Sequence, residues 1–111
     1  MSTPQSAEFE LSLEEANKIA EVGRMAEELS ENHAFKKLVL EGYFVEEASR
    51  LVHLLADPSM EKEQERITQA MHGIANFRQY LTTRVQMGRM AENEIRNIRE
   101  AMVEMEQEDL H

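Results

Sequence analysis

The chain lacks cysteine and tryptophan, and it has only two prolines and four glycines among its 111 residues. Without cysteine it can form no disulfide, no thiolate metal site and no cysteine nucleophile. So few prolines and glycines, with 31% charged residues, favour helices over a β-sandwich or barrel. Eight methionines suit helix packing, because the flexible thioether fills irregular gaps. The composition therefore predicts a small all-α protein.

Long apolar runs are also missing. No run approaches the roughly 18 residues that a membrane-spanning helix needs. Met1–Phe9 has neither the basic segment nor the apolar segment of a signal peptide. We therefore expect no membrane association, and a protein of the cytosol or of a particle assembled there.

Acidic residues outnumber basic ones by 22 to 12, which gives a net charge of −10. Such a charge argues against non-specific binding of the whole surface to nucleic acid or anionic lipid. The charge is uneven, since residues 1–57 are acidic, residues 66–99 contain six arginines, and residues 100–111 contain no lysine or arginine. An acidic half beside a basic segment suggests self-association or pairing within the chain. An ordinary solvated helix face is the alternative.

The apolar periodicity predicts three helices between two tails. The N-terminal residues 1–11 are small and polar, and we expect them to be disordered. Ser12 and Glu15 have the spacing of a capping box at the start of the first helix. The expected segments are a disordered tail at 1–11, one helical domain at 12–107 with helices at about 13–30, 33–56 and 58–107, and a second tail at 108–111.

Two residues mark the starts of the later helices. Asn32 is a typical N-cap, and Asp57 followed by Pro58 predicts a turn and a cap on the long helix. Gly42 either ends a short second helix or permits close packing. The short connection at Asp57 predicts an antiparallel helical hairpin. We expect its facing residues to be Phe44, Leu51 and Leu55 on one side, and Ile67, Ile74 and Leu81 on the other.

The last predicted helix is too long for a small globule, since Met60–Gln107 would span about 70 Å at about 1.5 Å per residue. Gly73 and Gly88 mark kinks in it or close contacts with another helix. Its final part repeats apolar residues as a coiled coil does, and so does the first helix. Either helix 1 folds across this part, or copies of the chain pair there, so we expect a homo-oligomer. The candidate self-association residues are Ile19, Val22, Leu29, Ile95, Ile98, Met102 and Met105.

Catalytic and metal-binding constellations are not apparent. The four histidines form neither the pair of Glu-x-x-His motifs of a di-iron helical bundle nor a His-Glu-x-x-His motif. The paired glutamates fit solvated helix surfaces better than an acid–base site. There is no glycine-rich phosphate loop. We therefore expect no enzyme, no cofactor, and no catalytic, cofactor-binding or metal-binding residue.

A row of arginines is the most specific charged feature. Arginine suits bidentate carboxylate or phosphate recognition, and the neighbouring Phe77 and Tyr80 could stack on bases. Pairing with the acidic first helix or with an acidic partner, a solvated face, and nucleic-acid binding through residues 66–99 all remain open. The candidate charge-pairing row is Arg78, Arg84, Arg89 and Arg96.

The stretch 32–90 contains the text NHAFKKLVLEGYFVEEASRLVHLLADPS and then MHGIANFRQYLTTRVQMGRMAENEI. It resembles small acidic all-helical proteins encoded by tailed bacteriophages. The resemblance implies a phage origin, a role in the virion or its assembly, and a location in the host cytoplasm or the virion. It transfers no catalytic or ligand-binding residue. The residues that carry it are Phe35, Gly42, Tyr43, Phe44, Glu47, Arg50, Leu51, Leu54, Leu55, Pro58, Gly73, Ile74, Arg78, Gln79, Tyr80 and Gly88.

Three functional hypotheses follow. The first is a non-enzymatic phage structural or assembly protein, acting as a helical oligomer that bridges other subunits. The second is an acidic phage inhibitor that occupies a nucleic-acid-binding surface of a host enzyme, and it predicts salt-dependent binding to a basic protein. The third is a small DNA-packaging accessory subunit that uses the arginine row.

Overall fold

The computed structural model describes residues 4–109, and these are helical except at Asn32, Ala56 and Asp57. No strand occurs among them, which confirms the all-α class. The middle segment η1 is π-helical, η2 is a 3₁₀-helix, and the others are α-helices. The elements in chain order are α1 (Pro4–Glu31), α2 (His33–Phe35), η1 (Lys36–Glu47), α3 (Ala48–Leu55), η2 (Pro58–Glu63) and α4 (Gln64–Asp109).

Both ends of the described chain are helical where the sequence predicted tails. Helix α1 includes Pro4, a residue type favoured in a first helical turn, so residues 4–11 are not the expected disordered segment. Ser12 lies inside α1 and does not begin it, and half-buried positions occur ahead of it at Ser6 and Phe9. Helix α4 continues to Asp109. The remaining parts of the two predicted tails, residues 1–3 and 110–111, lie outside the described residues.

The two other predicted caps are confirmed. The Asn32 side-chain oxygen accepts a hydrogen bond of 3.0 Å from the backbone N–H of Phe35. The Asp57 carboxylate accepts a bond of 2.9 Å from the Ser59 backbone N–H and one of 2.8 Å from the Ser59 hydroxyl. Pro58 follows at the first position of η2. These bonds satisfy backbone donors that a helix start would otherwise leave open.

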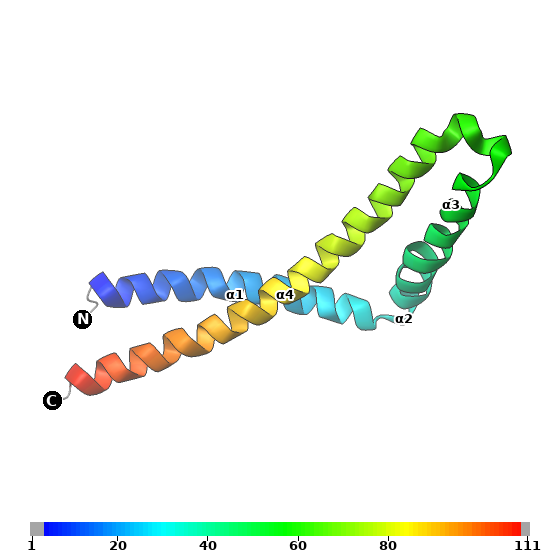
Figure 1. The fold of residues 1–111 in the computed structure, drawn as a ribbon. Coiled ribbons are helices and arrows are strands. Elements are labelled where there is room, and N and C mark those ends of the chain that lie inside the picture. The colour runs from blue at the N-terminus through cyan, green and yellow to red at the C-terminus, as the bar shows by residue number, and fades with distance from the viewer. Residues whose placement is uncertain (1–3, 110–111) are drawn as a thin grey trace. The chain divides into compact units, whose positions relative to one another are not determined.

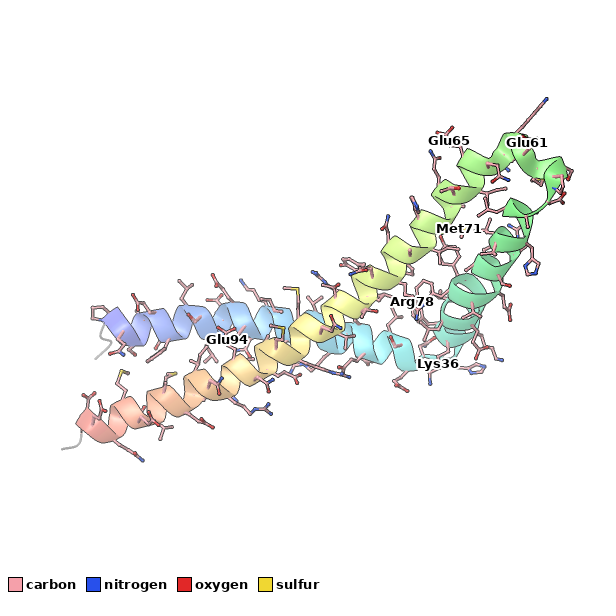
Figure 2. All side chains as sticks on the ribbon, in the orientation of Figure 1. Lys36, Glu61, Glu65, Met71, Arg78 and Glu94 are labelled. Atoms are coloured by element: carbon pink, nitrogen blue, oxygen red, sulfur yellow. The ribbon has the colours of Figure 1, made fainter. Side chains whose placement is uncertain are left out.

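The chain divides into two compact units, and α4 contributes to both. Unit 1 comprises residues 1–26 and 84–111, and unit 2 comprises residues 27–83. Unit 2 is the predicted helical hairpin, in which η2 reverses the chain so that α3 lies beside the first part of α4 (Figure 1). Side chains of both arms fill the space between them, with Met71 among those from α4 (Figure 2). The buried centre is Phe44, Leu51, Ile67 and Ile74.

The π-helical segment η1 carries part of a half-buried to buried apolar series that begins just before it and ends just after it. Phe35, Leu40, Phe44 and Ala48 recur at steps of four or five, which is wider than the 3.6-residue turn of an α-helix. A π-helix closes its hydrogen bonds from i to i+5, so it can keep such a series on one side. Gly42 lies within this segment and does not end it, and a Cβ there would stand 3.0 Å from the Lys37 carbonyl oxygen.

Unit 1 consists of α1 and the later part of α4, which run in opposite directions along each other (Figure 1). The start of α1 and the end of α4 therefore lie at the same end of this unit. No helix within residues 4–109 is long and apolar enough to cross a membrane.

Candidate functional site: an apolar groove beside a glycine contact

The backbones of α1 and α4 meet at two glycines. A Cβ built on Gly23 would lie 2.6 Å from the Cα of Gly88 and 2.9 Å from the carbonyl oxygen of Arg84. A Cβ built on Gly88 would lie 2.7 Å from the Cα of Gly23. Side-chain carbons do not approach backbone atoms that closely, so both positions need glycine. Of the two roles predicted for Gly88, a close helix contact is the one observed.

Small residues continue this contact along unit 1. The four members of its core cluster are Ala16, Ala20, Ala91 and Ile95, and Ala20 is fully buried. Leu13 packs against the same cluster. On α1, Ala20 and Ala16 precede Gly23 at steps of three and four residues. On α4, Ala91 and Ile95 follow Gly88 at the same steps, as expected for the facing sides of two antiparallel helices. Unit 1 is therefore a close helix pair whose core is mostly alanine and glycine.

The structure separates the predicted self-association residues into two groups. Ile95 and Ile98 are only 7% and 8% exposed, and Ile95 packs against alanines of α1, as expected if helix 1 folds across the C-terminal part. Met102 and Met105 are half-buried. Ile19, Val22 and Leu29 keep 40%, 44% and 43% of their surface exposed. Their part in self-association stays a prediction.

A shallow groove lies beside the glycine contact. It has a volume of about 200 Å³ and is lined by Ile19 and Val22 of α1, by Met87 of α4, and by Lys18 and Arg84. The Arg84 guanidinium lies 3.6 Å from the sulfur of Met87, one turn away on the same helix. Three apolar side chains thus form the walls of this groove, with two cationic residues beside them.

The opposite edge of unit 1 is charged. Arg24 of α1 and Glu92 of α4 form an ion pair with an N–O distance of 3.9 Å. At about 100° per residue, Arg24 lies about 200° around α1 from Val22. The ion pair and the groove are therefore on opposite sides of the glycine contact.

The predicted arginine row is divided between the two units and between two faces. Arg78 belongs to unit 2, whereas Arg84, Arg89 and Arg96 belong to unit 1. Arg84 lines the groove, while Arg96 donates to the Asn93 side chain on its own helix. Pairing of this row with an acidic partner stays a prediction.

Unit 2 carries an aromatic cluster. The ring centroids of Tyr43, Phe44 and Phe77 lie 5.5–6.5 Å apart in tilted and edge-on arrangements. Phe77, which the sequence suggested as a base-stacking residue, is therefore in contact with two rings of its own unit. Tyr80 is 55% exposed.

The titratable groups with shifted pKa values have local structural causes. A side-chain hydrogen bond from Arg50 lowers the pKa of Glu47, and the same bond raises the pKa of Arg50. The hydroxyl and the backbone N–H of Ser59 lower the pKa of Asp57. Within residues 4–109, no group of three His, Asp or Glu side chains is placed to hold a metal ion. His53 Nδ1 lies 2.7 Å from the Ser49 carbonyl oxygen of its own helix.

Comparisons with protein-family models, with curated proteins and with solved structures gave no match. The groove itself includes two residues that the sequence reasoning missed, Lys18 and Met87. The signal for the helix contact beside it was the row of small residues Ala16, Ala20 and Gly23, matched by Gly88 and Ala91 on α4.

Proposed function

We propose that this chain is a non-enzymatic helical assembly protein, which self-associates through unit 1 and bridges other subunits. The observation that carries the proposal is the exposure of Ile19, Val22 and Met87 around one groove. Exposed apolar residues that gather on one side of a protein are typical of an interaction surface.

The small core of unit 1 supports this proposal. Its buried cluster contains three alanines and one isoleucine, and such side chains bury little apolar area. Full burial of a Val, Ile or Met side chain contributes about 1.5–3 kcal/mol, so covering the half-exposed Ile19, Val22 and Met87 would contribute about 1 kcal/mol each. A partner that covers the groove would therefore add stability that unit 1 cannot obtain from its own core.

Unit 2 supports the bridging part of the proposal. It has its own apolar core, and it also exposes large apolar residues. A protein with two separately packed units can use one for self-association and present the other to a different subunit. We propose phage assembly, in the host cytoplasm or the virion, as the setting of this role, because the sequence resembles small phage proteins. The exposed large apolar residues of unit 2 are Leu29, Leu38, Tyr43, Val45, Val52, Phe77 and Tyr80.

Mass in solution tests the proposal, measured by light scattering at low and high salt. We expect the wild-type chain to form a discrete oligomer that survives salt, because apolar contacts are not screened. Val22→Glu should reduce the mass to that of a monomer. The matched control is Val103→Glu, an exposed valine outside the groove, which should leave the oligomer intact. A wild-type monomer at every concentration would contradict the proposal and favour the acidic inhibitor.

A further inference from the structure

The side of unit 1 that contains the groove, called the groove edge below, carries charges of both signs. On α1, Glu15, Ile19 and Val22 are separated by four and three residues, so Glu15 lies on the groove side. On α4, Glu94 is seven residues from Met87 and therefore lies on the same face of the helix. Both glutamates are exposed.

These charges are separated along the length of unit 1. The two helices are antiparallel. The direction from Val22 to Glu15 along α1 is therefore also the direction from Met87 to Glu94 along α4. Glu15 and Glu94 therefore lie towards one end of the edge, and Arg84 lies at the other end. Lys18 lies at the end that contains Glu15 and Glu94 and pairs with Glu14 at 3.6 Å on its own helix, so this end keeps a net negative charge.

We propose that a second copy of the chain docks on this edge in the opposite direction, related by a two-fold axis. Ile19, Val22 and Met87 of the two copies then cover one another. Arg84 of each copy faces Glu15 and Glu94 of the other. In such a two-fold contact both copies use the same surface, so no further copy can add to it. The helix pairs of the two copies together form a four-helix bundle. This inference rests on the self-association proposed above.

Charge complementarity selects this occupant and its direction. A partner of a single charge sign would meet one end of the edge favourably and be repelled at the other. A second copy in the same direction would place Arg84 against Arg84, and such like-charge contacts are strongly unfavourable. Only the inverted copy brings opposite charges together at both ends, while the apolar centre is covered by identical residues.

A charge-reversal experiment tests the arrangement, with dimerisation measured by analytical ultracentrifugation at low salt. Arg84→Glu alone and the double change Glu15→Arg with Glu94→Arg should each weaken the homodimer by about tenfold or more. An equimolar mixture of the two variants should form a heterodimer of about wild-type affinity. The control Arg96→Glu reverses a charge on the opposite side of α4 and should leave the wild-type affinity. Circular dichroism confirms that each variant is helical.

Cross-linking provides a second test that needs no charge reversal, because the chain contains no cysteine. Copies with Glu15→Cys, mixed with copies with Arg84→Cys and treated with a short bismaleimide, should cross-link to each other. Cross-links between two Glu15→Cys copies would overturn the inverted arrangement, and so would charge variants that dimerise like the wild type. An oligomer that fails these tests leaves the proposed self-association standing, whereas a wild-type monomer contradicts both.

Discussion

The two units of this chain are packed in different ways. Unit 1 brings helix backbones together through Gly23 and Gly88, with alanines beside them. Unit 2 keeps its helices apart with Phe44, Leu51 and Ile74, and it adds an aromatic cluster. Close approach gives many backbone contacts but little buried apolar area, whereas large side chains bury more area at a wider spacing. One helix, α4, takes part in both kinds of packing.

This difference assigns different sensitivities to the two units. A core of large side chains loses stability when atoms are removed, because a cavity remains. A backbone contact through glycine loses stability when atoms are added, because nothing can move aside without separating the helices. The following changes test that contrast, from the largest expected effect to the smallest.

Phe44→Ala should have the largest effect and should act on unit 2. Phe44 is only 8% exposed and contacts two other rings, so its removal should destabilise unit 2 by about 3–5 kcal/mol. Hydrogen exchange should become faster in α3 and in the first part of α4, while amides near Ala20 keep their protection. Tyr80→Ala, at an exposed position, is the control. Equal loss of protection in both units would show that they unfold as one.

Gly88→Ala should act on unit 1, with a destabilisation of about 1–3 kcal/mol. The new Cβ would lie 2.7 Å from the Gly23 backbone. Gly73→Ala is the matched control on the same helix, because its Cβ would meet only the Tyr43 hydroxyl at 3.9 Å. This control should stabilise the protein by up to about 1 kcal/mol through helix propensity. Thermal unfolding measures both, and a similar response of the two variants would show that the glycine contact is unimportant.

Asn32→Ala should destabilise unit 2 by about 1 kcal/mol, since it removes the side-chain acceptor for the Phe35 backbone N–H. Asn32→Asp retains an acceptor and should restore most of the stability. Urea denaturation measures this difference. Equal losses in the two variants would mean that the hydrogen bond contributes nothing.

Asp57 gives the smallest effect, which depends on pH. The hydrogen bonds from Ser59 lower the pKa of Asp57, so its ionised form is favoured in the folded protein. Its contribution to stability is fully present above the unfolded pKa of about 3.9, and is lost as the pH falls through the lower folded pKa. Asp57→Asn keeps an acceptor but does not titrate. Melting temperatures between neutral and acidic pH should fall more steeply for the wild type than for this variant, and parallel curves would contradict the prediction.

The elements that depend on local chemistry were predictable from the sequence. Asn32 and Asp57 are short polar side chains ahead of apolar periodic segments, and both form the expected caps. The hairpin followed from the apolar face of each arm and the short connection at Pro58, so Phe44, Leu51, Ile67 and Ile74 form its core as predicted.

The features that depend on tertiary contact were not predictable in the same way. The capping-box spacing at Ser12 gave the wrong start for α1, which begins eight residues earlier with Pro4 in its first turn. The π-helical geometry of η1 appears in the sequence only as apolar steps of four and five. The groove depends on which face of α1 meets α4, and Gly23 determines that face.

The glycine contact makes unit 1 sensitive to the length of the chain as well as to its composition. One residue inserted directly after Ala20 would turn the rest of α1 by about 100° and place Val22 opposite Gly88. An insertion of seven residues would nearly restore the original phase. The π-helical part of unit 2 already has one more residue in each hydrogen-bonded turn, so a deletion there can be absorbed by a return to α-helical turns. Single-residue insertions and deletions should therefore be selected against much more strongly in α1 than in η1.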